Sequence, residues 1–130
     1  MTQPATHLGI NAALCGSPVS LSEGKAVVEF TATVEMAADA RELVHGGFVF
    51  GLADYAAMLA VNDPNVVLGN ADVRFLAPVQ VGDVVQATAT LLESSKRKRV
   101  LETSAVVGER EVFRGTMTAF VLDHHVLDGK

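Results

Sequence analysis

The chain has 130 residues, 49% of them hydrophobic, which predicts a single domain over residues 1–130 with a sizeable core. Its net charge of -5 argues against a nucleic-acid partner, because phosphate binding needs a clustered basic surface. Cys15 is the sole cysteine, so the composition excludes an intrachain disulfide and a cysteine-based metal site. The N-terminus has no basic residues followed by an apolar run, and we therefore expect a cytoplasmic protein.

The N-terminal third is expected to form a short helix and a hairpin. Residues 8–16 are mostly apolar and end in glycine, which is typical of a short helix that covers the core. Segments 19–21 and 26–34 are rich in β-branched residues and flank a turn at Ser22-Glu23-Gly24. A polar connection or short helical turn over 37–43 then leads to the next element.

The stretch from His45 to Val61 is the only long one that reads as a helix. From Phe48 onward nearly every residue is apolar or small, so the helix lacks a polar stripe and should be buried. It falls short of the ~20 apolar residues of a membrane span, so we expect protein to surround it and no membrane partner. Asp54 is its only charge, and a carboxylate there is costly unless it is paired or used.

The sequence after this helix predicts strands throughout. The helix should end at Asn62-Asp63-Pro64-Asn65, because proline cannot continue it. Short turns and loops separate four expected strands, the first covering 66–68 and then 71–76, and the others 84–92, 99–107 and 111–122. Hairpin-like connections in meander style imply antiparallel pairing, and hence an α+β fold. Because one flat sheet cannot cover a helix that has no polar face, we predict a curved antiparallel sheet wrapped around one long central helix.

Three motifs, in their order along the chain, resemble a known family. They are His45-Gly46-Gly47-x-x-Phe50-x-Leu52-Ala53-Asp54, Phe75-Leu76-x-Pro78-x-x-x-Gly82-Asp83 and Phe113-Arg114-Gly115. The first resembles the helix-start motif of the PaaI-type acyl-CoA thioesterases of phenylacetate degradation, which have the hotdog fold. The others are similar to a strand-turn signature and a last-strand element of that family.

The resemblance implies hydrolysis of an acyl-CoA thioester to free acid and CoA. Asp54 would be the nucleophile or the general base, and the amide N–H groups of Gly46 and Gly47 would polarise the thioester carbonyl. The resemblance also implies a homodimer with active sites at its interface, or a dimer of dimers. His45 would donate to the substrate or orient the loop. We expect no cofactor.

Elementary geometry supports the dimer independently. The first turn of a helix leaves N–H groups unpaired at the positive end of its dipole, and glycine lets a ligand approach them. Asp54 follows Gly46 by eight residues, or about 12 Å along a helix, so one carbonyl cannot touch both. If both act, the acid comes from a partner subunit. Alternatively, the glycines only allow tight helix entry, and Asp54 is a structural carboxylate satisfied by the backbone or by Arg74.

The remaining candidates concern substrate binding. The only basic run consists of Lys96, Arg97, Lys98 and Arg99, which we assign as a hypothesis to the phosphates of CoA, the alternative being a solvated hairpin tip. The resemblance places Asn70 and Asp72 at substrate-lining positions, where relatives have a hydroxyl residue. Phe48, with Val49 and Leu52, would line an apolar acyl pocket. His124-His125 has no acid or thiol at ligand spacing, so we predict no metal site.

Two other functions compete with hydrolysis. Some hotdog proteins bind acyl-CoA without cleaving it and act in regulation, but binding alone does not need a carboxylate beside a thioester. A hotdog dehydratase would need a histidine and an acid together, and the helix has no histidine after His45.

Overall fold

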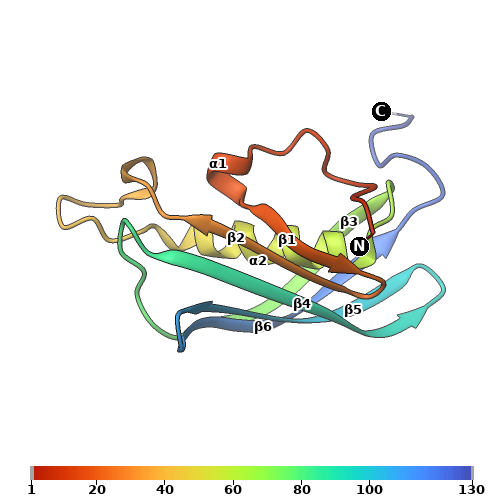
Figure 1. Ribbon diagram of the computed structural model, residues 1–130. Coiled ribbons are helices and arrows are strands. Elements are labelled where there is room, and N and C mark those ends of the chain that lie inside the picture. The colour runs from red at the N-terminus through yellow and green to blue at the C-terminus, as the bar shows by residue number, and fades with distance from the viewer. Residues whose placement is uncertain (1, 130) are drawn as a thin grey trace.

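A six-stranded antiparallel sheet curves around one long helix in the computed structural model, which describes residues 2–129 (Figure 1). The helices are α1 (Ala12–Cys15), the 3-10 turn η1 (Val34–Met36) and α2 (Gly46–Val61). The strands are β1 (Ser17–Ser22), β2 (Lys25–Thr31), β3 (Val66–Phe75), β4 (Val84–Ser95), β5 (Lys98–Val107) and β6 (Arg110–Val121). The predicted α+β class and the predicted wrapping of a sheet around a central helix are confirmed.

The strand order β1-β2-β4-β5-β6-β3 corrects the predicted meander. Among the four strands after α2, β4, β5 and β6 follow one another as neighbours, whereas β3 pairs with β6 and β4 also pairs with β2. The chain crosses between β3 and β4 around the start of α2, where the Val44 N–H donates to the Val79 carbonyl (2.8 Å) and Leu43 bridges to Gln80. As a result β3 is an edge strand of ten residues with one unpaired side.

Several predicted element boundaries differ from those in the structure. The first strand after the helix, predicted over 66–68 and 71–76, is continuous through a bulge, because the register shifts at Gly69 without ending the pairing with β6. The predicted loop 94–98 is only the turn Lys96-Arg97, and Lys96 adopts a left-handed φ of 55° there. Residues 37–43 form no helical turn but a bridged loop, and the expected first helix shrinks to α1.

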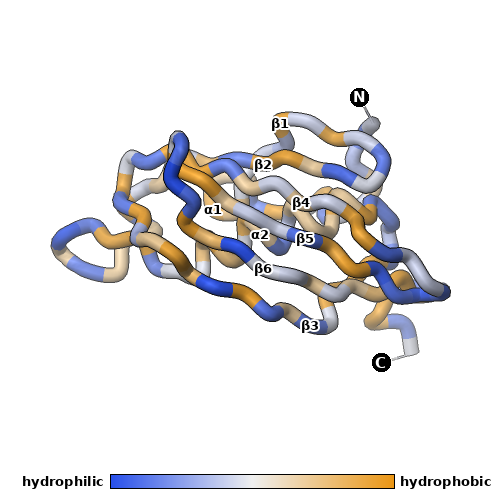
Figure 2. The backbone as a smooth tube through the Cα atoms, turned by 90° about the horizontal axis from the view of Figure 1, so that it is seen from below, coloured by the Kyte–Doolittle hydropathy of each residue, from blue (hydrophilic) through white to orange (hydrophobic). Residues whose placement is uncertain are grey.

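The core lies between α2 and the inner face of the sheet. Side chains alternate along the strands, so that Val28, Ala87 and Leu101 are fully buried against α2. Figure 2 shows hydrophobic stretches along the strands and hydrophilic residues gathered in the turns at both ends. Nine residues of α2 are buried, as expected for a helix with almost no polar side chains. None of the helices in the described residues is long and apolar enough to span a membrane.

The C-terminal end of α2 is closed by Asn62, which has a left-handed φ of 55° and donates its N–H to the Met58 carbonyl (2.8 Å). The Asn62 side chain also accepts from the Ala5 N–H (2.7 Å) and donates to the Gln3 carbonyl (3.0 Å). These two bonds fasten residues 2–7, which we call the N-terminal strap, across this end of the helix.

Candidate functional site

Asp54 lies in the middle of α2 and has no ion-pair partner among residues 2–129. Its Oδ1 atom is buried and has no hydrogen-bond partner among the described residues. Burial raises the pKa of Asp54 from 3.8 to about 6. Arg74, the alternative partner, is exposed on β3 opposite Arg114, so the structure does not support a satisfied structural carboxylate. A buried, unpaired acid of this kind indicates a functional site.

The helix face that carries Asp54 is open toward the start of α2. Gly47, Gly51 and Asp54 follow one another at steps of four and three residues and therefore share this face. A Cβ built on Gly51 would meet nothing within 4 Å, so space remains beside Asp54. Further along, Met58 is 1% exposed. The opening is thus confined to the first half of the helix.

The first turn of α2 keeps its amide donors free. The N–H groups of Gly46 and Gly47 have no acceptor within the described part of the chain. His45 occupies the N-cap position with extended backbone, but its side chain makes no capping hydrogen bond. Its own N–H donates to the Met36 carbonyl (2.9 Å), which holds the helix start against η1. Two polar donors at the positive end of a 16-residue helix are therefore available to an anionic or polarised oxygen.

An apolar pocket of about 390 Å³ adjoins these amides. Its walls include Gly46 itself, Val49 from α2, and Phe75 from the end of β3. Phe75 is 56% exposed, and a Cβ built on Gly46 would lie 3.2 Å from its ring. Phe75 was not predicted as a site residue, although the motif that begins with it was a usable signal.

The three residues predicted to line the acyl pocket lie in three different environments. Phe48 is partly buried and stacks edge-on against His45, with ring centroids 6.2 Å apart, so it borders the helix start. Val49 lines the pocket as predicted. Leu52, in contrast, is completely buried and packs beside Gly16, so it belongs to the core.

One protomer does not bring the acid and the amides together. Gly46 and Asp54 both lie on α2, eight residues apart, which separates them by about 12 Å. The unpaired edge of β3 is a surface on which a second strand can pair.

Asn70 and Asp72 are exposed on β3 and pair in register with Thr118 and Thr116. Their neighbours Ala71 and Val73 pack against the core, so the alternation of the strand points Asn70 and Asp72 to the outer face of the sheet. The structure therefore does not bring these two residues to the helix start or to Asp54 within one protomer.

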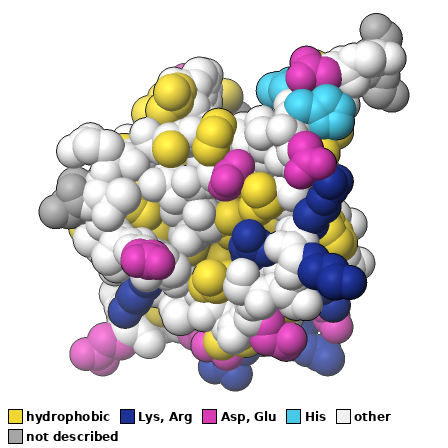
Figure 3. Space-filling model, turned by 90° about the vertical axis from the view of Figure 1, so that its right-hand side faces the viewer, with side chains coloured by type: hydrophobic (Ala, Val, Ile, Leu, Met, Phe, Trp, Pro, Cys, Tyr) yellow, Lys and Arg dark blue, Asp and Glu magenta, His cyan; other side chains and the backbone are white. Residues whose placement is uncertain are grey.

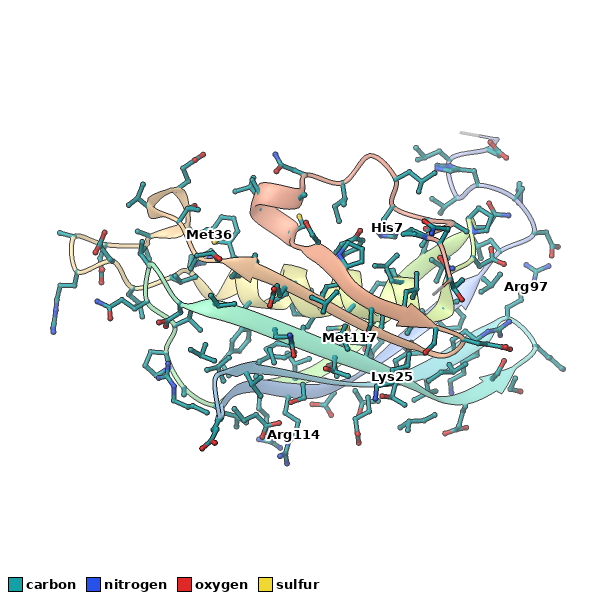
Figure 4. All side chains as sticks on the ribbon, viewed as in Figure 1. His7, Lys25, Met36, Arg97, Arg114 and Met117 are labelled. Atoms are coloured by element: carbon teal, nitrogen blue, oxygen red, sulfur yellow. The ribbon has the colours of Figure 1, made fainter. Side chains whose placement is uncertain are left out.

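The basic run lies at the far end of the molecule from Gly46. The Val121 N–H donates to the Arg97 carbonyl (2.8 Å), which ties the β4–β5 turn to the end of β6. Figure 4 shows Arg97 at the opposite end from Met36, next to which α2 begins. Arg97 pairs with Asp123, and Arg99 donates to the carbonyls of Lys96 and Lys98. Figure 3 looks at this end and shows Lys and Arg side chains gathered along one side.

Curated relatives share most of this chain but are longer. The chain is 49% identical over 119 residues to the methylthioribose-1-phosphate isomerase of Aquifex aeolicus, covering 91% of this chain and 26% of that protein. It is 27% identical over 119 residues to the transcription factor FapR of Caldanaerobacter subterraneus, covering 91% of this chain and 60% of that protein. The chain thus spans about a quarter of the first and three fifths of the second.

Solved structures match over nearly the whole fold. A protein from Pyrococcus horikoshii superposes with a TM-score of 0.96 and 47% identity, covering 98% of both chains. The Escherichia coli PaaI protein from the phenylacetic acid degradation operon gives a TM-score of 0.78 and 29% identity, covering 86% of this chain and 83% of PaaI. The thioesterase superfamily model matches residues 42–114, which is more than half of the chain. The protein therefore belongs to the thioesterase superfamily and has the hotdog fold that its sequence motifs resemble.

Proposed function

We propose that the protein hydrolyses acyl-CoA thioesters to a free acid and CoA, at two equivalent sites in a homodimer. The observation that carries this proposal is the buried, unpaired Oδ1 atom of Asp54 on a helix whose first turn keeps two backbone donors free. Thioester hydrolysis needs these two things: a group that attacks or activates water, and donors aimed at the oxygen where negative charge develops.

In the proposed reaction, the thioester carbonyl oxygen accepts hydrogen bonds from Gly46 and Gly47 of one protomer. Asp54 of the partner subunit then acts in one of two ways. It removes a proton from a water molecule that attacks the carbonyl carbon, or it attacks directly and forms a mixed anhydride that a water molecule hydrolyses. In both, the carbon–sulfur bond breaks and the CoA thiolate takes up a proton. The twofold axis would pass between the two α2 helices.

The comparisons support the general activity. The family is a thioesterase superfamily, and the E. coli PaaI protein shares the fold at 29% identity. A second candidate is a ligand-binding regulatory module, which the likeness to the transcription factor FapR supports. Asp54 favours the enzyme, because a sensor would gain nothing from an uncompensated carboxylate beside its ligand.

Thiol release from a panel of acyl-CoAs by the wild type and Asp54→Asn tests the proposal. We expect turnover in the wild type, and a loss of about 10²–10⁴-fold in kcat/KM in the variant, because the attacking or proton-accepting group is gone. Binding of the acyl-CoA should persist in Asp54→Asn, which separates lost chemistry from lost structure. Tight binding without turnover in the wild type would contradict the proposed enzyme and support the ligand-binding regulatory module.

A further inference from the structure

A second cavity, also of about 390 Å³, continues the apolar pocket beside Gly46. Pro78 and Val79 line both cavities, so the two cavities adjoin. The second cavity is formed by three segments that meet at the end of the molecule where α2 begins (Figure 1): the loop before α2, the β3–β4 connection and the β5–β6 turn.

Two arginines from distant parts of the sequence share this second cavity. Arg41 is exposed, and its guanidinium has no hydrogen-bond or ion-pair partner among residues 2–129. Arg110 is half exposed, and its ion pair with Asp83 has a distance of 3.7 Å, longer than a hydrogen bond. Guanidinium groups bind phosphate oxygens through parallel N–H donors, so this pair offers a site for a phosphorylated ligand.

The two acids of the cavity are engaged mainly by backbone. Asp39 Oδ1 accepts from the N–H groups of Arg41 (3.0 Å) and Leu43 (3.1 Å), and Asp83 Oδ2 accepts from the Gln80 N–H (2.9 Å). These bonds fix the turns that present the cations. The arginines therefore remain available even though the cavity contains two carboxylates.

We infer that the phosphates of the CoA moiety bind at Arg41 and Arg110, after its pantetheine arm has crossed the apolar pocket beside Gly46. This inference rests on the proposed function for the identity of its ligand. It also gives the ligand a direction. If the carbonyl lies at the amides of Gly46 and the arm leaves past Pro78, the acyl group extends the other way, along the face where Gly51 leaves open space. The basic turn at the far end of the same protomer then has no part in its ligand.

Titration calorimetry with CoA and with pantetheine, which lacks the nucleotide and its phosphates, tests this site in the full chain. We expect R41Q/R110Q to weaken CoA binding about tenfold, as for lost hydrogen bonds to charged groups, and to leave pantetheine binding unchanged. The matched pair K96Q/K98Q removes the same charge from the opposite end and should change neither. Because Arg110 also faces Asp83, the single variant R41Q repeats the measurement without disturbing that ion pair.

The outcomes are distinct. Weaker CoA binding in K96Q/K98Q and not in R41Q/R110Q would move the phosphates to the basic turn and overturn the inference. Equal affinity of the wild type for CoA and pantetheine, or no CoA binding, would also overturn it. Turnover assays test the proposed function independently of this site. A wild type that binds CoA through Arg41 and Arg110 but cleaves no acyl-CoA would refute the proposed hydrolysis and still support the phosphate site.

Discussion

The two ends of α2 are built in opposite ways. At the C-terminal end, Asn62 adopts the left-handed conformation, closes the last turn and fastens the N-terminal strap with its side chain. At the other end, His45 caps nothing, and the amides of Gly46 and Gly47 remain without acceptors in the described chain. Both ends had polar groups to satisfy, since every helix leaves orphan N–H and C=O groups.

The difference indicates that one end of the helix serves the stability of the fold and the other end serves ligand binding. Hydrogen bonds at the Asn62 end close the last turn and hold distant segments of the chain together. Those at the Gly46 end are left open beside an apolar pocket, where a ligand oxygen can complete them. Changes at the Gly46 end should therefore reduce activity and spare stability, whereas changes at the Asn62 end should do the reverse.

Among changes at the two ends of α2, the largest effect is expected from Gly46→Pro. Proline is well tolerated at the first position of a helix, and the extended His45 (φ -64°, ψ 130°) suits the residue before it. The substitution removes the amide donor while keeping the helix, so kcat should fall about 10²–10³-fold, as for a lost oxyanion-hole donor. Steady-state kinetics measure the loss of kcat, and thermal melts of the same preparations measure whether stability is retained.

Gly46→Ala is the control for this variant. It adds the same Cβ, which would lie 3.2 Å from the half-exposed Phe75 ring, but it keeps the N–H group. Alanine should retain most of the activity. Equal losses in both variants would attribute the effect to crowding by Phe75 and remove the Gly46 amide from the mechanism.

Asp54 should make both activity and stability depend on pH. Because the reaction needs the carboxylate, kcat/KM should rise as pH passes through about 6 and then level off. The folded-state pKa lies above its ordinary value of 3.8, so the protonated form stabilises the fold below about pH 4. This contribution, about 3 kcal/mol at most, is lost as pH rises through 6.

Denaturant unfolding of the wild type and Asp54→Asn across pH 3–8 isolates this contribution. The difference in unfolding free energy between the two proteins should shift in favour of the variant between pH 4 and 7. Parallel curves would mean that the carboxylate is solvated or neutralised in the assembled protein, which would contradict the buried, unpaired acid.

Features of the fold and site that depend on neighbouring residues could be predicted from the sequence, whereas those that depend on contacts between distant residues could not. The helix from His45 to Val61 and its lone acid followed from local composition, since an apolar run bounded by Gly-Gly and Asn-Asp-Pro allows few alternatives. Strand β3 was misplaced in the sheet, because its pairing with β6 joins residues that are 38 (Phe75 and Phe113) to 55 (Val66 and Val121) positions apart. Arg41 and Arg110 likewise line the same cavity only because three segments that are distant in the sequence converge there.

The basic run illustrates the same limit. Its residue types correctly suggested a charged turn, but nothing local could show that the turn lies at the far end of the molecule from Gly46. Asn70 and Asp72 were predicted from the family resemblance, whereas the alternation of β3 decides which face they occupy. Where a side chain points depends on register, and register depends on the partner strand.

A smaller effect, on stability alone, is expected from Asn62→Ala. Alanine is strained at φ 55° and loses both bonds to the strap, so the free energy of unfolding should fall by about 2 kcal/mol. Asn62→Gly accepts the left-handed backbone and should lose only the part due to the strap. The kcat of the folded protein should not change in either variant. A loss of kcat would show that the strap reaches the site and would erase the distinction between the two ends.

The smallest effect is expected at His45. His45→Asn introduces a good N-cap side chain, which can accept from the Gly47 or Phe48 N–H, and should raise the free energy of unfolding by about 1 kcal/mol. Because that cap competes with the substrate for the Gly47 amide, activity should fall severalfold as stability rises. His45→Ala gains no cap and should keep most of the activity, as measured by kcat/KM beside urea unfolding. If alanine were as inactive as asparagine, the imidazole itself would contact the substrate, and the open helix start would not by itself explain why histidine stands at this position.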